Sequence, residues 1–298
     1  MIQDVIVTGA SGYLGGRVCR QLVREGYRVT TLVRPGSEKD AHAGTRKVRH
    51  DLMQGPVDCS EFDLMIHCAG EVRPSDPNGD IAKSVNVRLA ENAVRCRAKR
   101  LLVISSIAAS VAEVTPRRAN RYGYEKLAAE YAIRNLLRPG QDCVFLRPPA
   151  IYGPMVDGPL ATLAALIRRG TPLPLAWAHT PRPYLSSRNF ESLISAIVAA
   201  PDQTWAAAHL ATPEPHDGML ISTRSLCQHL ARSMKRKSSL FGMPNGLLRL
   251  GGWMTGRSAL ISSALDAVPI RYGDLPAELW GWTPLDQMPD SLTYLRSQ

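Results

Sequence analysis

A tyrosine and a lysine stand four residues apart in the segment Tyr122-Gly123-Tyr124-Glu125-Lys126. In a helix, this spacing places both side chains on one face. A tyrosine hydroxyl is a weak acid, but a nearby ammonium group and the positive end of a helix stabilise its phenolate. Such a tyrosine can protonate a carbonyl oxygen or deprotonate an alcohol. The pair therefore indicates acid–base chemistry at an oxygen atom, with Tyr122 and Lys126 as catalytic candidates.

Three glycines near the start of the chain indicate what works with this pair. The apolar run Val5–Val7 precedes Gly9, Gly12 and Gly15, and apolar residues at helical spacing follow. Strand, glycine-rich turn and helix is the context in which such glycines bind a dinucleotide. Gly9 can make the tight turn, Gly12 lets the backbone approach a pyrophosphate, and Gly15 lets the helix pack on the strand. N–H groups at the helix start then hold the phosphate charge.

Apolar runs of strand type alternate with helical segments through the first half of the chain. Strands are expected at 5–7, 28–33, 63–70, 100–106 and 143–146, and helices after 15, at 84–96 and at 120–136. This alternation predicts a parallel sheet covered on both faces. Ser105 and Ser106 end one strand, where the loops of an open α/β sheet line the ligand crevice. A serine there can hydrogen-bond the oxygen on which the tyrosine acts; Ser106 is the candidate and Ser105 the reserve.

The pattern changes after residue 150, where Pro and Gly interrupt the chain. Helices are expected at 160–169, 189–200, 223–236, 244–254 and after 284, with a last strand at 206–211. We predict an α/β fold: a Rossmann-type doubly wound parallel sheet with a smaller, mixed C-terminal substrate domain. The first domain covers 1–155, to which 189–211 returns, and the second covers 156–188 and 212–298.

The chain of 298 residues has a formal net charge of +10. The cations are scattered and mostly arginine, so attraction of anionic small molecules is favoured over nucleic-acid binding. No apolar run approaches the ~20 residues that span a bilayer. The apolar stretch Gly246–Met254 is interpreted as a core helix, and Trp253, Trp280 and Trp282 as packing residues. No membrane partner is therefore expected.

The cysteines and histidines indicate neither a disulfide framework nor a metal site. The six cysteines form no Cys-x-x-Cys pair, and the seven histidines lack metal-ligand spacing. Cys19, Cys68 and Cys143 lie in apolar segments and are interpreted as buried free thiols. His67 is interpreted as a strand-end histidine with satisfied hydrogen bonds. With no signal peptide before the first strand, a cytoplasmic protein is expected.

These motifs together resemble the extended short-chain dehydrogenase/reductase family, of the nucleotide-sugar epimerase/dehydratase type. The matching pieces, in the family's order, are Thr8–Gly15, Asp51-Leu52, His67–Gly70, Asn86-Val87, Ile104–Ser106, Tyr122-x-x-x-Lys126 and Leu146–Pro154. In the second half, Arg182-Pro183-Tyr184 and Gly281-Trp282-Thr283-Pro284 are similar to segments of bacterial members acting on nucleotide sugars.

The resemblance implies a role for each matching residue. Tyr122 would be the general acid/base, Lys126 would hold the nicotinamide ribose, and Ser106 would orient the substrate oxygen. Arg182 would contact the substrate diphosphate, because a planar guanidinium suits bidentate anion binding. The implied cofactor-binding set is Gly9, Ser11, Gly12, Tyr13, Leu14, Gly15, Arg34, Asp51, Leu52, Ala69, Gly70, Asn86, Tyr122, Lys126, Pro149 and Ile151.

The end of the second strand bears on the choice of cofactor. An acidic residue there would bind the adenine ribose of NAD. This chain has Arg34, with Lys39 nearby. A cation suits the 2′-phosphate of NADP, so NADP(H) is favoured and NAD(H) is the alternative.

The expected activity is NAD(P)-dependent chemistry at C4 of a UDP- or dTDP-linked hexose, by a 4-keto reductase or a 4-epimerase. Ile107 stands where many sugar epimerases have a catalytic hydroxyl, and the short interval from Ser106 to Tyr122 predicts a shortened loop at 107–121. An NADPH-dependent reductase of apolar ketones, of the steroid or flavonoid type, is one alternative. A non-catalytic NADP-sensing protein is another, although such proteins often lack the Tyr/Lys pair. The resemblance also implies a homodimer through the Tyr122 helix.

Overall fold

The computed structural model describes residues 1–36, 42–155, 159–256, 258–268 and 276–297. The described residues form two compact units. Unit 1 takes its residues from 1–148, 191–215 and 269–283, and unit 2 from 149–190, 216–268 and 284–298.

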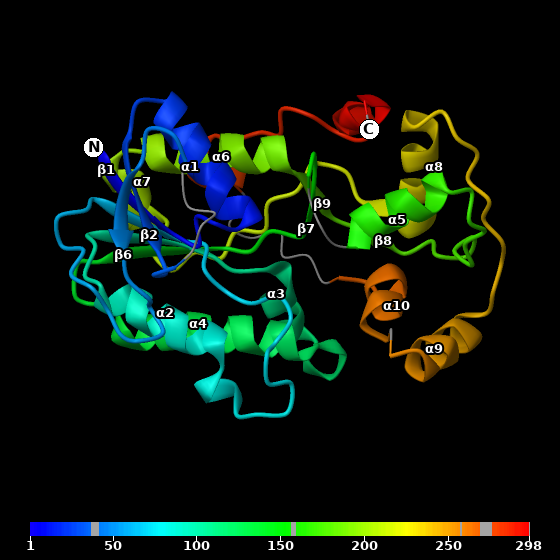
Figure 1. Ribbon diagram of the computed structural model, residues 1–298, viewed down its shortest axis with the longest axis horizontal. Helices are drawn as coiled ribbons and strands as arrows, with labels where there is room; N and C mark the ends of the chain where they lie inside the picture. The colour runs from blue at the N-terminus through cyan, green and yellow to red at the C-terminus, as the bar shows by residue number, and fades with distance from the viewer. Residues whose placement is uncertain (37–41, 156–158, 257, 269–275, 298) are drawn as a thin grey trace. The chain divides into compact units, whose positions relative to one another are not determined.

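Unit 1 is built on a six-stranded parallel sheet in the order β3-β2-β1-β4-β5-β6 (Figure 1). Its strands are β1 (Asp4–Thr8), β2 (Arg28–Val33), β3 (Arg46–Arg49), β4 (Leu64–His67), β5 (Arg100–Ile104) and β6 (Asp142–Leu146). The central strands are buried on both faces, so the sequence shows continuous apolar runs there. The order reverses between β1 and β4, where open α/β sheets bind ligands. The predicted Rossmann-type sheet is confirmed.

Helices cover both faces of this sheet (Figure 1). They are α1 (Tyr13–Arg24), α2 (Val85–Arg95), α3 (Ile107–Val114), α4 (Arg121–Leu136), α6 (Ser187–Ala199), α7 (Asp202–Ala207) and α11 (Pro276–Trp280), with short 3₁₀ turns η1 (Ile81–Lys83) and η2 (Pro116–Arg118). Helix α4 packs against α2 and α3 on one face. On the other face α1 lies beside α6, and Arg17 Nη1 donates to Glu191 at 2.7 Å.

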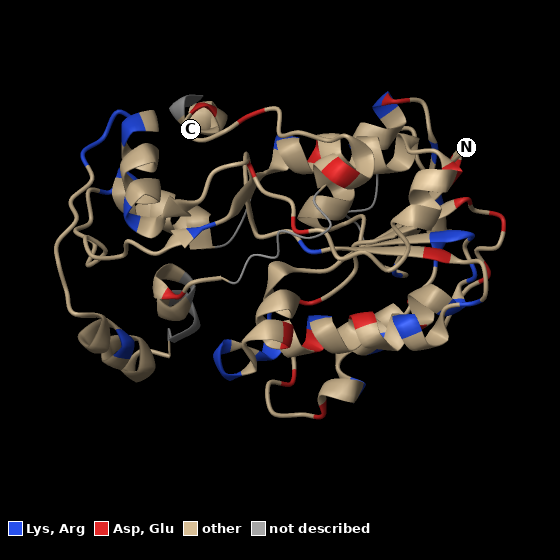
Figure 2. Ribbon diagram, turned by 180° about the vertical axis from the view of Figure 1, so that it is seen from behind, with Lys and Arg blue, Asp and Glu red and all other residues tan. Residues whose placement is uncertain are grey.

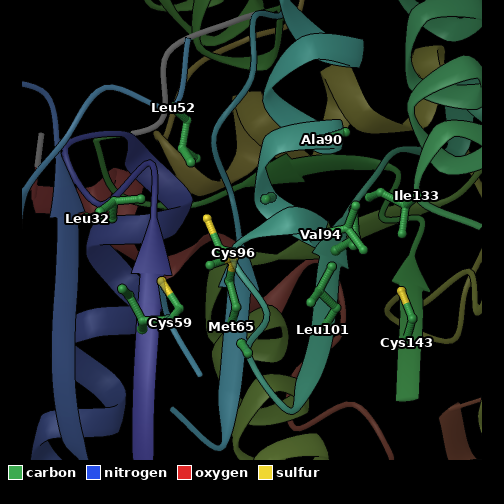
Figure 3. Packing of buried hydrophobic residues seen from close by; sticks show 14 of the residues in the cluster. Leu32, Leu52, Cys59, Met65, Ala90, Val94, Cys96, Leu101, Ile133 and Cys143 are labelled. Atoms are coloured by element: carbon green, nitrogen blue, oxygen red, sulfur yellow. The ribbon is translucent and has the colours of Figure 1, made fainter. Parts of the chain in front are cut away.

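A hydrophobic core lies between the sheet and α2 and α4. Met65, Leu101 and Cys143 from the strands meet Val94 and Ile133 from the helices (Figure 3). Fully burying a large apolar side chain contributes about 1.5–3 kcal/mol. This packing fixes the carboxyl ends of the strands relative to α4, which is where the chemical candidates stand.

Residues 206–211, predicted as a strand, are instead the end of α7 followed by irregular backbone. That backbone still runs beside β6, because Leu210 N donates to the Cys143 carbonyl at 2.7 Å and Arg147 N to the Pro213 carbonyl at 2.9 Å. Leu210 has a φ of 64°, which breaks a regular strand, and Pro213 has no N–H to donate. The predicted strand is wrong, and the chain beside β6 is irregular.

Unit 2 is smaller and mixed. Its parallel pair is β7 (Ala150–Tyr152) with β9 (Tyr184–Ser186), and its antiparallel pair is β8 (Pro181–Arg182) with β10 (Ile221–Ser222). Its helices are α5 (Pro159–Arg168), α8 (Thr223–Ser233), α9 (Asn245–Met254) and α10 (Ser258–Leu265), with the 3₁₀ segment η3 (Asp290–Ser297). Helix α8 packs against α5 and η3.

A buried carboxylate ties the elements of unit 2 together. Asp217 accepts hydrogen bonds from the Tyr152 hydroxyl at 2.5 Å, from Ser186 N at 2.9 Å and from Asn189 Nδ2 at 2.6 Å. Burial raises the pKa of Asp217 above its ordinary value, against the effect of these donors. The cluster joins β7, β9 and the start of α6.

Three packing predictions are wrong. Helix α9 is not a core helix: Leu248 is buried, but Trp253 is 74% exposed. The interpretation of Trp253 as a packing residue fails with it, whereas Trp282 is buried as predicted. Cys68 is only partly buried, unlike Cys19 and Cys143. Within the described residues, no helix combines the length and the apolar character needed to cross a membrane.

Candidate active site

The glycine turn packs closely against the loop that follows β4. Gly9 has a φ of +67°, and a Cβ atom there would lie 2.6 Å from Ala69 N. Gly12 N donates to the Gly9 carbonyl at 3.0 Å. A Cβ atom on Gly15 would overlap that same carbonyl oxygen, so α1 can approach β1 only with glycine here. Gly12 is the N-cap of α1 and supplies no side-chain cap, which leaves backbone N–H groups of the first turn for an anion.

A cavity of about 270 Å³ opens beside this turn, at the carboxyl ends of β1, β2 and β4. Its wall contains eight of the predicted cofactor residues: Gly9, Ser11, Gly12, Arg34, Asp51, Leu52, Ala69 and Gly70. The sequence analysis gave no cofactor role to the other wall residues, which are Thr8, Leu32, Val33, His50, Met53, Cys68, Glu71, Val85 and Leu89. Most of these directly adjoin predicted residues at strand ends, and that adjacency was the available signal.

The residues that line the cavity suit the pyrophosphate part of a dinucleotide. Glycines without side chains form its floor, and the start of α1 offers unsatisfied N–H groups to a pyrophosphate. Arg34, exposed just after β2, supplies a cation on the wall. The Asp51 carboxylate accepts from Met53 N at 2.9 Å, which fixes the turn that carries Leu52. Lys39 lies outside the described residues.

His67 is hydrogen-bonded to Thr8, a residue of the cavity wall. Its Nδ1 and the Thr8 hydroxyl form a hydrogen bond of 2.9 Å, and Ala69 N donates to the same hydroxyl at 3.2 Å. Burial lowers the pKa of His67 to about 3, with the charge of Lys126 acting in the same direction. His67 is therefore neutral at neutral pH and serves as the satisfied strand-end residue that the sequence predicts.

The structure brings Tyr122 and Lys126 together near the loop that follows β4. Asn120 caps α4, and the Lys126 ammonium lies 6.0 Å from the centre of the Tyr122 ring. Lys126 Nζ donates to the Ile104 carbonyl at 3.1 Å, at the end of β5. A Cβ atom on Gly70 would lie 3.3 Å from Lys126 Nζ. Gly70 is part of the cavity wall, so the Lys126 ammonium lies close to that wall, although neither Tyr122 nor Lys126 is itself among the residues that line the cavity.

Ser106 begins the segment that joins β5 to α4. Its hydroxyl accepts a hydrogen bond from Ala108 N at 3.2 Å and thereby caps α3. Residues 107–121, predicted as a shortened loop, are largely helical, with Ile107 as the first residue of α3. Helix α3 packs tightly on α4, since a Cβ atom on Gly123 would lie 2.5 Å from the Ala108 carbonyl. The serine cap and this close packing explain the helix.

Ser105 is committed to a buried ionic network instead of the cavity. Its hydroxyl donates to Glu130 at 2.5 Å. Arg147 donates to the same carboxylate from Nε at 2.9 Å and from Nη2 at 2.6 Å, and to Glu113 at 2.7 Å. Arg147 and Glu130 are both fully buried. The network locks β5 and β6 to α4, and it engages the hydroxyl of Ser105.

A second buried carboxylate on α4 supports the loop after β4. Glu125 accepts from Asn86 Nδ2 at 2.9 Å and from Arg121 Nε at 2.8 Å. Asn86 Oδ1 in turn accepts from Glu71 N at 2.9 Å, next to Gly70. Asn86 is thus placed behind the cavity wall, which it supports indirectly. Sequence reasoning missed both glutamates, although Arg121 and Glu125, and likewise Glu130 and Arg134, are spaced by four and form ion pairs.

The predicted substrate contact lies in unit 2. Arg182, on β8, donates from Nη1 to the Asp266 carbonyl at 2.9 Å. Burial lowers the pKa of Arg182 below its ordinary value. Among the described residues, no carboxylate forms an ion pair with its guanidinium. Pro149 and Ile151 also belong to unit 2, at the start of β7, and their cofactor roles stay predictions.

Comparisons with known proteins bear on this arrangement. A UDP-glucose 4-epimerase of Vibrio cholerae is 24% identical over 95% of this chain and 92% of its own length. A ceramide reductase of Caulobacter vibrioides is 29% identical over 50% of this chain and 47% of its own length. The solved structure of the Bordetella bronchiseptica enzyme WbmG in complex with NAD and UDP superposes with a TM-score of 0.70. The two chains are 15% identical, and the match covers 100% of this chain and 94% of WbmG.

The family model named "NAD dependent epimerase/dehydratase family" matches residues 5–207, which include the glycine turn, the Tyr122–Lys126 pair and the buried supports of both. On that match and this geometry, the chain is an enzyme that belongs to the NAD dependent epimerase/dehydratase family.

Proposed function

We propose that this enzyme acts at C4 of a UDP- or dTDP-linked hexose, as a 4-keto reductase or a 4-epimerase, with Tyr122 as general acid/base. One observation carries the proposal: the Lys126 ammonium lies beside both the Tyr122 ring and Gly70 of the cofactor cavity. A proton donor and a dinucleotide site are therefore adjacent. Proton and hydride transfer at one carbon–oxygen bond need that adjacency.

The nicotinamide cofactor would supply or accept the hydride at the substrate carbon. Tyr122 would give a proton to the C4 oxygen during ketone reduction, or remove the hydroxyl proton during oxidation. Lys126 would stabilise the phenolate electrostatically, and its hydrogen bond to the Ile104 carbonyl holds it in place. The Ser106 hydroxyl, whose oxygen already accepts from Ala108 N, keeps its proton to donate to the C4 oxygen.

Arg182 supports a substrate that carries a diphosphate. Its guanidinium is partly buried and has a backbone carbonyl, but no carboxylate, as its partner among the described residues. Such a cation has donors left for an anion, and its planar fork matches two phosphate oxygens. The full-length similarity to a UDP-glucose 4-epimerase, and the UDP bound by WbmG, favour a uridine nucleotide.

For the cofactor we propose NADP(H), on the strength of Arg34 at the cavity wall. The structural neighbour WbmG holds NAD, which makes NAD(H) the competing assignment. Replacing Arg34 by glutamate should weaken NADPH binding at least tenfold, with little change for NADH, in a fluorescence titration of the purified protein. Equal loss for both cofactors would contradict the assignment to the 2′-phosphate.

The test of activity mixes purified protein with NADPH and a UDP-4-keto-6-deoxy-hexosamine and follows the near-ultraviolet absorbance of NADPH. Steady oxidation that Tyr122→Phe abolishes, with cofactor binding retained, would establish a keto-sugar reductase. No oxidation, together with NAD(H) released on denaturation and interconversion of UDP-glucose and UDP-galactose, would establish an epimerase. A chain that binds no nicotinamide cofactor would refute both.

A second candidate is a reductase of apolar ketones. It is favoured by Ile107 after the two serines and by the ceramide reductase similarity, which covers half of this chain. In the same assay, a long-chain apolar ketone would replace the nucleotide sugar. Arg182→Ala separates the candidates: it should raise the KM for a nucleotide sugar at least tenfold and leave the KM for an apolar ketone unchanged.

The homodimer is also a proposal, resting on the resemblance alone. Light scattering of the purified chain should give twice the monomer mass. Substitution of exposed Tyr131 on α4 should return it to the monomer.

A further inference from the structure

Helix α9 presents an apolar face that the proposed chemistry does not use. The face, called here the α9 outer face, consists of Leu247, Leu250, Trp253 and Met254, which are 57, 52, 74 and 72% exposed. At about 100° per residue, these four side chains occupy an arc of roughly 120°. Leu248 and Gly252 are buried on the opposite side. The helix is thus apolar on both sides, although only one side meets the core.

The rest of α9 is firmly attached to unit 2. Leu248 belongs to the buried cluster that also contains Leu265 of α10. The two helices pack side by side (Figure 1). Arg249 forms an ion pair with Asp266, just after α10. The α9 outer face is therefore held in a defined orientation by the opposite side of its own helix.

The sequence between Asp217 and Asp266 carries cations at about the density of the whole chain but contains no acidic residue. Residues 218–265 contain no Asp or Glu, and seven cations: Arg224, Arg232, Lys235, Arg236, Lys237, Arg249 and Arg257. These seven equal most of the formal net charge of +10. Figure 2 shows Lys and Arg, without Asp or Glu, along α8, the connection that follows it and α9. An apolar face and an acid-free cationic segment therefore occur together in one unit.

We propose that the α9 outer face docks unit 2 on the surface of an anionic lipid bilayer. A helix that exposes Trp, Leu and Met buries that face at the boundary of headgroups and acyl chains. The one cation of α9, Arg249, is paired with Asp266, so the attraction to an anionic surface comes from the cations outside the helix. The ten residues of α9 extend about 15 Å, half of what a bilayer core requires, so the helix lies in the interface and does not span it.

Lipid is favoured over a second copy of this chain by the charges. Two copies meeting through this region would bring two acid-free, cationic segments together, which repel each other. An anionic leaflet satisfies the apolar face and the cations at once, with about 1 kcal/mol for each Lys or Arg near the surface. Trp253, the most exposed residue of the face, is of the type enriched at membrane–water boundaries.

The first experiment is flotation of the full chain with vesicles of phosphatidylcholine, alone or mixed two to one with phosphatidylglycerol. We expect binding to the mixed vesicles only. The paired substitution Leu250→Ser and Trp253→Ser should reduce this binding at least tenfold. Leu285→Ser is the matched control, because Leu285 is a 59% exposed leucine of the same unit outside α9; it should bind like the unchanged protein.

The second experiment separates charge from apolar contact. Arg236→Gln with Lys237→Gln should weaken binding to the mixed vesicles roughly tenfold to thirtyfold, on the basis of about 1 kcal/mol per cation. Arg117→Gln with Arg118→Gln removes the same charge from η2 in unit 1 and should have little effect. Added salt should weaken binding of the unchanged protein and of this control alike.

Two results would overturn the proposal. One is a folded protein, judged by circular dichroism, that floats with neither kind of vesicle. The other is binding that the α9 substitutions and the Leu285 control reduce equally. In the first case, dissociation of an oligomer by the α9 substitutions would show that the face is a contact between copies. Binding is measured without turnover, so these outcomes are independent of the proposed sugar chemistry.

Discussion

Helix α4 in unit 1 buries two carboxylates, whereas helix α9 in unit 2 exposes a row of large apolar side chains. Glu125 and Glu130 each have arginine partners at hydrogen-bond distance within unit 1. The α9 outer face has no comparable cover in the described part of unit 2. Both helices depart from the usual distribution of charged and apolar residues. The comparison teaches where each departure is compensated: α4 inside the protein, and α9 by something outside the chain.

The largest effect is expected where a charge would be left buried without its partner. Glu130→Ala removes the main acceptor of the fully buried Arg147 guanidinium. Breaking a buried ion pair from one side costs about 3–5 kcal/mol. The free energy of unfolding, from urea denaturation, should fall by that amount. The double substitution Glu130→Leu with Arg147→Met should recover part of this loss of stability. A loss below ~1 kcal/mol for Glu130→Ala would show that the Arg147 charge does not depend on Glu130 for its compensation.

The next effect compares the two sides of α9. Leu248→Ala opens a cavity in the core of unit 2 and should cost about 2–4 kcal/mol. Leu250→Ala, on the α9 outer face, should change the free energy of unfolding by less than ~0.5 kcal/mol. Thermal unfolding of both variants without vesicles is the measurement. Similar losses for the two leucines would mean that the α9 outer face is packed in solution and that the two sides of the helix do not differ.

A smaller effect is expected at the second carboxylate of α4. Glu125→Gln keeps an oxygen for Asn86 but removes the charge that pairs with Arg121. We expect a loss of about 1–2 kcal/mol in the free energy of unfolding. Because Asn86 holds the loop beside Gly70, the dissociation constant of the cofactor should rise with it. Glu125→Ala should raise the dissociation constant of the cofactor further. If Glu125 stabilises the fold only, cofactor binding will be unchanged in both variants.

The smallest effect is expected for the ion pair of Asp63 with Lys99, which lies at the surface, unlike the buried ion pairs of α4. Burial alone would raise the pKa of Asp63, but hydrogen bonds from Lys99 and from Gln3 N and Asp4 N lower it to about 2. A carboxyl whose pKa is lowered by folding stabilises the fold above its ordinary pKa near ~3.9. That stability is lost as the pH falls from about 4 to about 2. Asp63→Asn should flatten this part of a stability–pH curve, and an unchanged curve would contradict the assignment.

Sequence reasoning reached the sheet of unit 1 because its signals are local. Apolar runs such as Val5–Val7 are buried on both faces, and the glycine turn follows directly. Glu130 was missed because its importance comes from Arg147, which lies far away in sequence and is nearby only once β6 is in place. The interpretation of α9 as a core helix failed for a related reason. Apolar composition gives the same pattern whether a face meets a core or a partner outside the chain.

Both edges of the unit 1 sheet are closed to pairing with another chain. At one edge, β3 is short and has the sequence Arg46-Lys47-Val48-Arg49, whose three cations are exposed. At the other edge, the irregular backbone at 208–213 already occupies hydrogen-bonding groups of β6, and Pro213 offers no N–H of its own. Charged, short or covered edges prevent sheets of neighbouring molecules from joining into aggregates. The enzyme can therefore accumulate at high local concentration, for example where many copies gather on one surface, without its sheets growing into one another.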